Sequence, residues 1–341
     1  MMKKLFIIVV VLIFVGGALG TLYYWNQISW PVSDDTSTKL YAVREGEGVK
    51  EIAQGLFEAG LIKSTFWFET YVFFDGSESQ FIAGTYSLSP SLNSREVVDV
   101  LTSGETTPEA NITMIEGWTA EDMGAYLEER GVVRKDEFLQ AALVTDSRDI
   151  ISDVTYGFLA DKPDNQGLEG FLFPDTYRIY DGATSADVIK KMLDNFDVKL
   201  SDELRSAAAA RGMSIYEIVT LASIIEKEVR SDDDRAIASG IFYARLEQGV
   251  ALQSDATVNY VTGKQALQPT LEDLETDNPY NTYKHQGLPP GPICNPSLSA
   301  LRAAVYPAET EYFYFLTKPD GSTVFSVTYD EHLENKAKYL Q

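Results

Sequence analysis

The sequence predicts an α+β protein that combines an N-terminal transmembrane helix, a small βααβ module and a larger mixed α+β domain. Leu5 to Tyr24 form an apolar run without a charged residue. Residues 39–106 follow the pattern strand, helix, helix, strand, and residues 107–341 mix amphipathic helices with short strands. The chain has 341 residues, which is enough for two or three small domains or one large domain.

The apolar run has the length and the flanks of a membrane anchor. About twenty helical residues, at about 1.5 Å each, span about 30 Å, the thickness of a bilayer core. Two lysines precede the run and the next charged residue is Asp34, which places the N-terminus in the cytoplasm. The aromatic cluster Tyr23–Trp25 suits the outer interface. We therefore expect a cytoplasmic start and anchor in residues 1–25 and a polar linker in residues 26–38.

The competing interpretation of this run is a cleaved signal peptide, with Gly17–Gly20 as the small residues near the cleavage site. The length of the run and the aromatic residues after it favour a retained anchor in the plasma (inner) membrane. Both interpretations place the rest of the chain outside the cytoplasm. There it meets cell-wall polymers and has no ready access to ATP or NADH.

Composition excludes several classes of function. The formal net charge of −23 repels nucleic-acid phosphates and argues against docking flat on an anionic lipid surface. Cys294 is the single cysteine, so no disulfide can form within the chain. The two histidines, His285 and His332, offer few partners for a cysteine nucleophile and no zinc-binding spacing. We expect neither a metal nor another cofactor.

The small module, residues 39–106, is expected to contain two strands and three helices. Apolar periodicity and turn glycines predict a strand at Leu40–Val43, helices at Val49–Ala59 and Ser64–Phe74, a strand at Ala83–Leu88 and a helix at Ser94–Leu101. This order resembles a LysM-like module, a small fold that binds N-acetylglucosamine polymers. A plain spacer domain is weighed evenly against that interpretation, because short βααβ units are common.

The larger domain, residues 107–341, is expected to begin with a connecting subdomain in residues 107–165. Its predicted elements are a strand at Asn111–Ile115, helices at Ala120–Arg130 and Lys135–Leu143, a core strand ending in a turn at Gly167–Tyr177, helices at Ser214–Arg230 and Arg235–Leu246, a polar segment entering a short helix at Leu252–Tyr260, a rigid loop at Tyr280–Ile293, and a hairpin of Tyr312–Leu316 with Thr323–Ser326.

The helix at Ser214–Arg230 carries the strongest chemical signal. It is apolar nearly all round, so we expect it to be buried, and Glu226 and Glu228 lie at its end. Burial raises the pKa of a glutamate, which is what a general acid needs at neutral pH. The two glutamates lie about 200° apart around the helix. One can be an acid, and the other is then structural, paired with Lys227, Arg230 or Arg235; spacing alone does not choose between them.

Five motifs, LEGFLFPDTY, LASIIEKEV, LQSDATVNY, YNTY and GLPPGPICNP, closely resemble the endolytic murein transglycosylase family (YceG-like). They occur in the family's order, and the resemblance covers essentially the whole chain. It implies a catalytic domain in residues 107–341 that cleaves the bond between N-acetylmuramic acid and N-acetylglucosamine, leaves 1,6-anhydro ends and limits strand length. The second glutamate of the Glu-Lys-Glu motif, Glu228, is then the catalytic acid. Val229 and Ser297 stand where many members carry Thr and Gly.

The resemblance also implies a set of substrate-binding residues, namely Glu169, Asp175, Gln253, Asp255, Asn281 and Tyr283. The alternative for each is that it holds the loops in place. Glu226 is expected behind the acid, without contact to the substrate. The implied partners are peptidoglycan glycan strands and cell-wall synthases. Two rival functions stay open: a hydrolytic muramidase with Asp255 or Glu169 as second carboxylate, and a non-catalytic glycan-binding scaffold.

Overall fold

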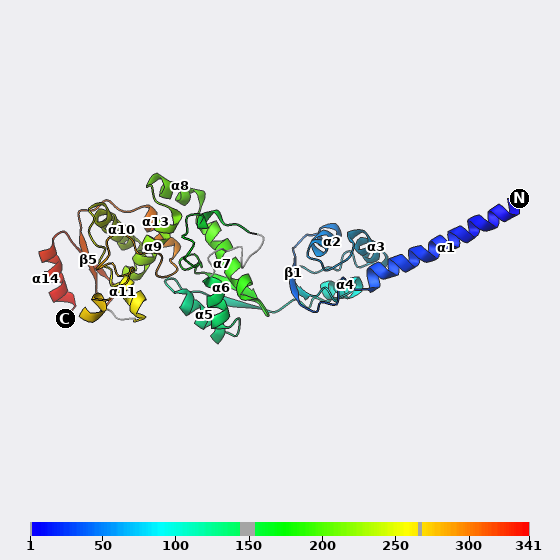
Figure 1. Ribbon diagram of the computed structural model, residues 1–341, viewed down its shortest axis with the longest axis horizontal. Helices are drawn as coiled ribbons and strands as arrows, with labels where there is room; N and C mark the ends of the chain where they lie inside the picture. The colour runs from blue at the N-terminus through cyan, green and yellow to red at the C-terminus, as the bar shows by residue number, and fades with distance from the viewer. Residues whose placement is uncertain (1, 144–153, 265–267, 341) are drawn as a thin grey trace. The chain divides into compact units, whose positions relative to one another are not determined.

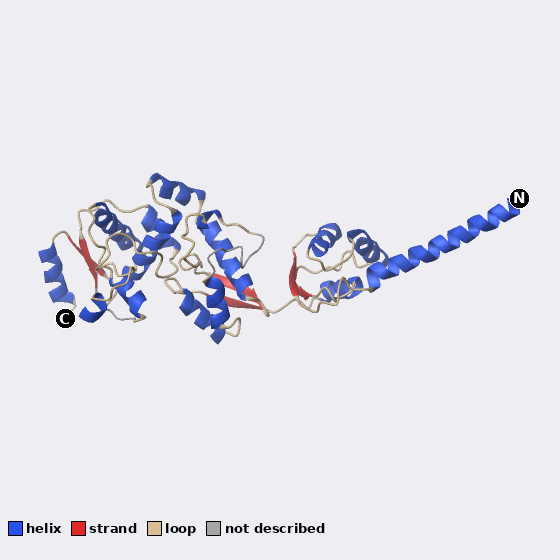
Figure 2. Ribbon diagram, in the orientation of Figure 1, coloured by secondary structure: helices blue, strands red, loops and turns tan. Residues whose placement is uncertain are grey.

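The structure, a computed structural model, describes residues 2–143, 154–264 and 268–340 (Figure 1). The chain divides into two compact units, Met1–Glu109 and Ala110–Gln341, and each unit has a hydrophobic core of its own. Helices and short two-stranded sheets occur in both units (Figure 2), which confirms the predicted α+β class.

The first unit contains the predicted order of strands and helices. Strands β1 (Lys39–Val43) and β2 (Gly84–Leu88) pair antiparallel, with Lys39 opposite Leu88. The other elements of this unit are α2 (Val49–Glu58), α3 (Thr65–Asp75) and α4 (Ser94–Ser103). Apolar side chains of both strands and all three helices meet in one core, which includes Ile52, Leu56, Phe68, Val72, Tyr86, Leu88, Val97 and Leu101.

Helix α1 (Met2–Ser29) continues further than the sequence predicts. Its C-terminal end packs on α3 and α4, where Ile28 is fully buried and the Arg95 guanidinium lies 4.9 Å from the Trp25 ring centroid. The predicted linker, residues 26–38, therefore begins too early. Burial of Ile28 keeps the last turn of the helix in place.

Within the described part of the chain, no single helix is long and apolar enough to count as a candidate membrane span. Helices α8 (Asp202–Ala210) and α9 (Ile215–Glu228), bent by 97° to one another, meet that test of length and composition only as a pair.

The second unit is built around one buried helix. Its elements are β3 (Glu109–Thr113), α5 (Ala120–Glu129), α6 (Lys135–Ala142), the 3₁₀ turn η2 (Gly157–Leu159), β4 (Thr176–Tyr180), α7 (Ser185–Lys199), α8 (Asp202–Ala210), α9 (Ile215–Glu228), α10 (Asp232–Glu247), α11 (Asp255–Thr262), α12 (Leu271–Leu274), α13 (Leu298–Val305), β5 (Tyr314–Thr317), β6 (Thr323–Ser326) and α14 (Tyr329–Tyr339). Strand β3 pairs with β4, and β5 pairs antiparallel with β6.

Helix α9 lies at the centre of this unit. Its residues from Tyr216 to Ile225 are buried except Glu217, as its apolar circumference predicts. Ser214 begins the helix with a capping box: its hydroxyl accepts the Glu217 N–H, and the Glu217 carboxylate accepts the Ser214 N–H. Helices α8, α10, α11 and α13 pack around it. The result is a rigid core helix whose C-terminal end carries the two candidate glutamates.

The segment Gly167–Tyr177 is not the predicted core strand. It runs through turns, and strand β4 begins only at Thr176. Its apolar side chains are buried, as a core strand would require, but the N–H groups of Gly170 and Leu172 donate to the Asn295 side chain instead of a neighbouring strand. Gly170 has a φ of +89°, and a Cβ there would lie 2.5 Å from Pro292. The buried Asn295 side chain thus takes the place of a neighbouring strand as hydrogen-bond acceptor.

Candidate active site

A large open cleft with a volume of about 2280 Å³ lies within the second unit. It exceeds the roughly 300–1,000 Å³ that is typical of pockets for small molecules. The C-terminal end of α9, the start of α5, the segment 250–264, the loop around Tyr283, β5 and α14 line it. A cleft of this size suits an extended substrate.

Glu228 ends α9 and faces this cleft. Burial raises the pKa of its carboxyl to about 7, and the nearby Asp255 carboxylate acts in the same direction. The Ser254 hydroxyl donates to Glu228 Oε1 at 2.5 Å, which lowers the pKa and opposes the effect of burial. Glu228 can therefore both give up and accept a proton near neutral pH.

Ser254 is held firmly in its place. Its N–H donates to Thr282 Oγ1 at 3.0 Å, and its carbonyl accepts the Thr257 hydroxyl at 2.7 Å. The two threonine hydroxyls are 2.9 Å apart, and both residues are buried. The motifs LQSDATVNY and YNTY thus meet to aim one hydroxyl at Glu228. Ser254 was not among the residues predicted for the site.

We expect Ser254→Ala to raise the pKa of Glu228 above about 7, because the hydrogen bond that favours the charged form is lost. A general acid works while protonated, so the rate falls as pH rises through this pKa. In the variant that fall should move upward by about one pH unit, and the maximal rate should also drop. The measurement is the pH profile of glycan cleavage.

The matched control is Ser299→Ala, which removes a serine hydroxyl that donates to the exposed carboxylate of Asp232. Its pH profile should coincide with that of the unaltered protein. A profile of Ser254→Ala that stays in place or moves to lower pH contradicts the role assigned to Ser254.

Asp255 and Tyr283 form a pair beside the acid. The Tyr283 hydroxyl donates to Asp255 Oδ1 at 2.5 Å, and both residues line the cleft. Burial raises the pKa of Asp255 above its ordinary value, and the tyrosine hydrogen bond counteracts this. The Arg245 guanidinium, which donates to the carbonyls of Leu252 and Phe313, lowers the pKa of Glu228 electrostatically.

Gln253 lines the same wall with an unusual backbone. It is exposed and has a φ of +53°, in the left-handed region that residues other than glycine rarely adopt. Its N–H donates to the Thr282 carbonyl at 3.1 Å, which holds this conformation. Strain of this kind concentrates at functional sites, which supports its place among the substrate-binding candidates.

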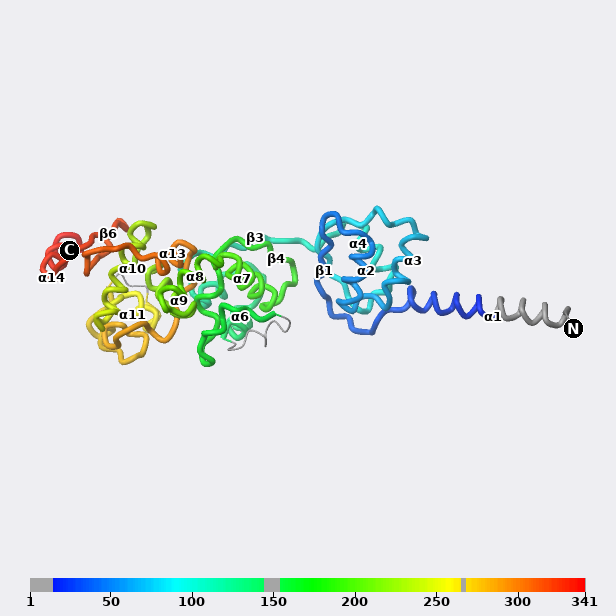
Figure 3. Tube along the Cα trace, turned by 90° about the horizontal axis from the view of Figure 1, so that it is seen from above, coloured from blue at the N-terminus to red at the C-terminus, as the bar shows by residue number. Residues whose placement is uncertain are grey.

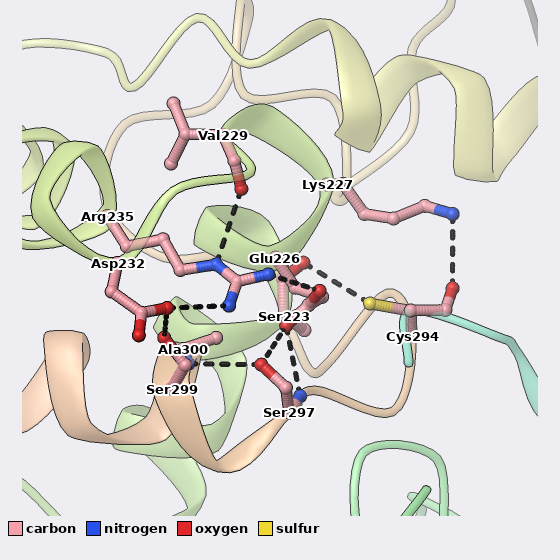
Figure 4. A network of polar contacts seen from close by, with 11 residues as sticks. Ser223, Glu226, Lys227, Val229, Asp232, Arg235, Cys294, Ser297, Ser299 and Ala300 are labelled. Atoms are coloured by element: carbon pink, nitrogen blue, oxygen red, sulfur yellow. Dashed lines mark hydrogen bonds and ion pairs between the residues drawn. The ribbon is translucent and has the colours of Figure 1, made fainter. Parts of the chain in front are cut away.

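Glu226 also borders the cleft, but its carboxylate is held in a closed network of polar contacts (Figure 4). Its Oε1 accepts from Arg235 at 2.7 Å, and its Oε2 accepts from the backbone N–H and the hydroxyl of Ser297 at 3.0 and 2.5 Å. The Glu226 and Arg235 side chains are only 6% and 8% exposed. Arg235 is thus the partner among the three cations considered above. Glu226 joins α9, α10 and the start of α13.

Glu169 lines the cleft at the N-terminus of α5. Both of its oxygens accept the Ala120 N–H, at 3.1 and 3.0 Å, and Oε1 also accepts from Asn295 Nδ2 at 2.7 Å. Burial nevertheless raises the pKa of Glu169 to about 7. Asn295 also donates to the Trp118 carbonyl at 3.1 Å, so it ties three distant segments together. The motif GLPPGPICNP contains it, but its role is visible only in three dimensions.

Two predicted substrate-binding residues do not line the cleft. The Asp175 carboxylate accepts from Asn195 and the Thr176 N–H and pairs with Lys199, which together lower its pKa. Asn281 is fully buried, and its Nδ2 donates to the carbonyls of Leu274 and Thr276. Both side chains hold loops, the alternative stated for them above.

Of the remaining reactive side chains, Cys294 and His285 lie outside the cleft, whereas His332 lines it. Cys294 is fully buried, its thiol donates to the Ser223 carbonyl, and burial raises the pKa of the thiol well above its usual value. His285 lies near Asp277, and His332 stacks on Tyr314. Among the described residues, no cluster of three or more His, Cys, Asp or Glu side chains could hold a metal ion.

A glutamate poised near neutral pH, with a fixed hydroxyl partner and a cleft for an extended substrate, defines a class: an enzyme that cleaves a polymer by general acid catalysis. Comparison with known proteins specifies the family. A model of the YceG-like family matches residues 41–338. The chain belongs to the YceG-like family, which confirms the resemblance seen in its motifs.

Its relatives include named enzymes. The chain is 34% identical over 327 residues to a Bacillus subtilis protein named endolytic murein transglycosylase, covering 94% of this chain and 90% of that protein. A Streptococcus pneumoniae protein of the same name is 28% identical, covering 98% of this chain and 64% of that protein. The crystal structure of a YceG-like protein from Listeria monocytogenes is 31% identical, with a TM-score of 0.60, covering 88% of this chain and all of that one.

Proposed function

We propose that this chain is an endolytic lytic transglycosylase of peptidoglycan and that Glu228 is its catalytic acid. The observation that carries the assignment to Glu228 is its carboxyl, which has a pKa of about 7 and faces the cleft with Ser254 on one oxygen. Two other glutamates of the cleft are engaged in the structure itself: Arg235 and Ser297 occupy both oxygens of Glu226, and the Ala120 N–H and Asn295 occupy those of Glu169. The names of the relatives support the reaction class.

The proposed reaction needs one carboxyl group. Glu228 gives its proton to the oxygen between N-acetylmuramic acid and N-acetylglucosamine, and the bond from that oxygen to the anomeric carbon breaks. The resulting carboxylate accepts the proton of the muramic 6-hydroxyl as this oxygen attacks the anomeric carbon. A 1,6-anhydro sugar forms without water, so no second catalytic carboxylate is required, in contrast to ordinary glycosidases. A pKa of about 7 suits both proton transfers.

Four of the predicted substrate-binding residues remain candidates for direct contact, namely Glu169, Gln253, Asp255 and Tyr283, because they line the cleft. Asp255 and Tyr283 lie beside the acid and can hydrogen-bond the sugar hydroxyls. Asp175 and Asn281 act on the loops that carry them.

The experiment that tests this function is mass spectrometry of purified glycan strands after treatment with the protein. We expect products ending in 1,6-anhydro-N-acetylmuramic acid, with cleavage inside the strand. Reducing-end sugars would instead identify a hydrolytic muramidase, for which Asp255 and Glu169, both in the lining of the cleft, are the candidate second carboxylates. Strands that are bound but left uncut would identify a glycan-binding scaffold.

We propose the following arrangement at the cell surface. The apolar run Leu5–Tyr24, which lies within α1, anchors the chain in the plasma membrane with its N-terminus in the cytoplasm. The module of residues 39–106 is LysM-like and residues 107–341 are the catalytic domain, outside the membrane. In this position the protein shortens new glycan strands where cell-wall synthases make them.

A further inference from the structure

One face of α3 exposes three phenylalanine rings. Phe66, Phe73 and Phe74 are 63%, 63% and 76% exposed, whereas Phe68 and Val72 of the same helix are fully buried. Residues 66 and 73 are seven positions apart, so their side chains leave the helix in nearly the same direction. A cluster of large exposed aromatic side chains of this kind marks a surface that contacts another molecule or a membrane.

The same helix packs against α1 where the apolar run ends. The Trp67 ring lies 6.0 Å from that of Tyr23 and 5.6 Å from that of Tyr24, both in edge contact. The Phe66 ring lies 4.8 Å from the Trp67 ring. Tyr23 and Tyr24 are the residues expected at the outer membrane interface, so the exposed face of α3 begins at that level.

Helix α1 is packed directly on the rest of the first unit. The helix continues to Ser29, Ile28 is fully buried, and Arg95 covers the Trp25 ring. Within this unit, Figures 1 and 3 both show α3 at the end from which α1 emerges, and β1 at the opposite end. The rings are therefore held close to the point where α1 leaves the bilayer.

We propose that the face formed by Phe66, Phe73 and Phe74 lies in the outer lipid interface, so that the first unit rests on the membrane surface. The proposal rests on the membrane anchor proposed above. Phenylalanine rings are stabilised at the boundary of headgroups and acyl chains, because they leave water there.

Lipid fits this face better than a glycan does. A sugar-binding surface places hydrogen-bonding groups beside its aromatic rings. Two polar residues lie between Phe66 and Phe73 on the helix: the Thr70 hydroxyl donates to the Phe66 carbonyl at 2.7 Å, and Glu69 is partly exposed at the edge of the face. The net charge of −23 also excludes attraction to anionic lipids as the main cause of binding. Because this charge opposes docking on an anionic surface, we expect insertion into zwitterionic bilayers and no gain in insertion from anionic lipid.

The test uses the full chain in vesicles of phosphatidylcholine, with or without phosphatidylglycerol, and a nitroxide spin label on an introduced cysteine. Cys294 is fully buried, so labelling is directed to the new thiol. The label is placed at Phe74→Cys. The matched control is Leu40→Cys, an exposed apolar position on β1, and Gly16→Cys in α1 reports on the anchor. Accessibility to oxygen and to a water-soluble nickel chelate then gives the depth of each label.

In phosphatidylcholine vesicles we expect the labels at positions 16 and 74 to favour oxygen and the label at 40 to favour the chelate, with no gain in insertion from phosphatidylglycerol. A label at 74 that matches the one at 40, with 16 inside the bilayer, overturns the lipid face and leaves the anchor intact. If the labels at 16 and 74 are both in water, the lipid face and the membrane anchor are both overturned. A label at 74 that is protected by N-acetylglucosamine oligomers instead of vesicles identifies a glycan surface and also overturns the proposal.

Discussion

Replacing Glu228 by glutamine is expected to lower the rate of glycan cleavage by about 10²–10⁴-fold. Glutamine keeps the shape of the side chain and can still accept from Ser254, but it has no proton to give to the glycosidic oxygen. Binding of glycan strands should persist, because the walls of the cleft do not change. The measurement is the amount of 1,6-anhydro product per unit time, together with strand binding by the same preparation.

The matched control for this variant is Glu247→Gln, which changes an exposed glutamate at the end of α10, away from the cleft. It should keep the full rate. If Glu228→Gln cleaves as fast as Glu247→Gln, Glu228 is not the acid. If Glu228→Gln binds no glycan although it is folded, the lost rate reports on binding, and the assignment of a proton-transfer role fails.

Replacing Arg235 by methionine is expected to cause the largest loss of stability. It leaves the Glu226 carboxylate, 6% exposed, without the cation that lies 2.7 Å away. Removing one partner of a buried ion pair typically costs about 3–5 kcal/mol. For a unit of about 150–250 residues this lowers the Tm by about 6–20 °C, at about 2–4 °C per kcal/mol. Thermal unfolding of the full chain measures the change.

Arg134→Met provides the comparison. Arg134 also pairs with a glutamate at 2.7 Å, but both side chains are more than half exposed. Water and salt screen such a pair, so the Tm should change little. Equal Tm values for the two variants would show that the Glu226–Arg235 pair does not hold α9 and α10 together.

Much of the fold follows from local sequence signals. Helix α9 was predicted from its apolar circumference and its capping box, and both are present. Helix α10 begins three residues earlier than predicted. Ser231 caps it, and the acidic residues at 232–234 form its first turn. There the negative charges interact favourably with the positive end of the helix dipole. Helices α7, α8, α12, α13 and α14 lie outside the predicted elements.

Hydrogen bonds between side chains and segments far apart in the sequence could not be predicted. The segment around Gly170 has the apolar residues of a strand, but its N–H groups donate to the side chain of Asn295, which lies 125 residues later in the sequence. The same limit applied to the site. Sequence reasoning found two glutamates on opposite sides of α9, and the family motif chose Glu228. The folded chain selects Arg235 from the three cations named as possible partners and adds Ser254, and these two residues distinguish the environments of the two carboxyls.

The position of Asn295 has a consequence for the order of synthesis. Its backbone and side chain bind Trp118 and Glu169, and the Thr317 hydroxyl donates to the Glu228 carbonyl at 2.7 Å. The partners in these side-chain bonds are 126 residues (Asn295 and Glu169) and 89 residues (Glu228 and Thr317) apart, and such pairs form late because the long loop between them must close first. A nascent chain has no complete site until residues near Thr317 have left the ribosome, so an unfinished polypeptide is inert toward the wall that it is made to cut.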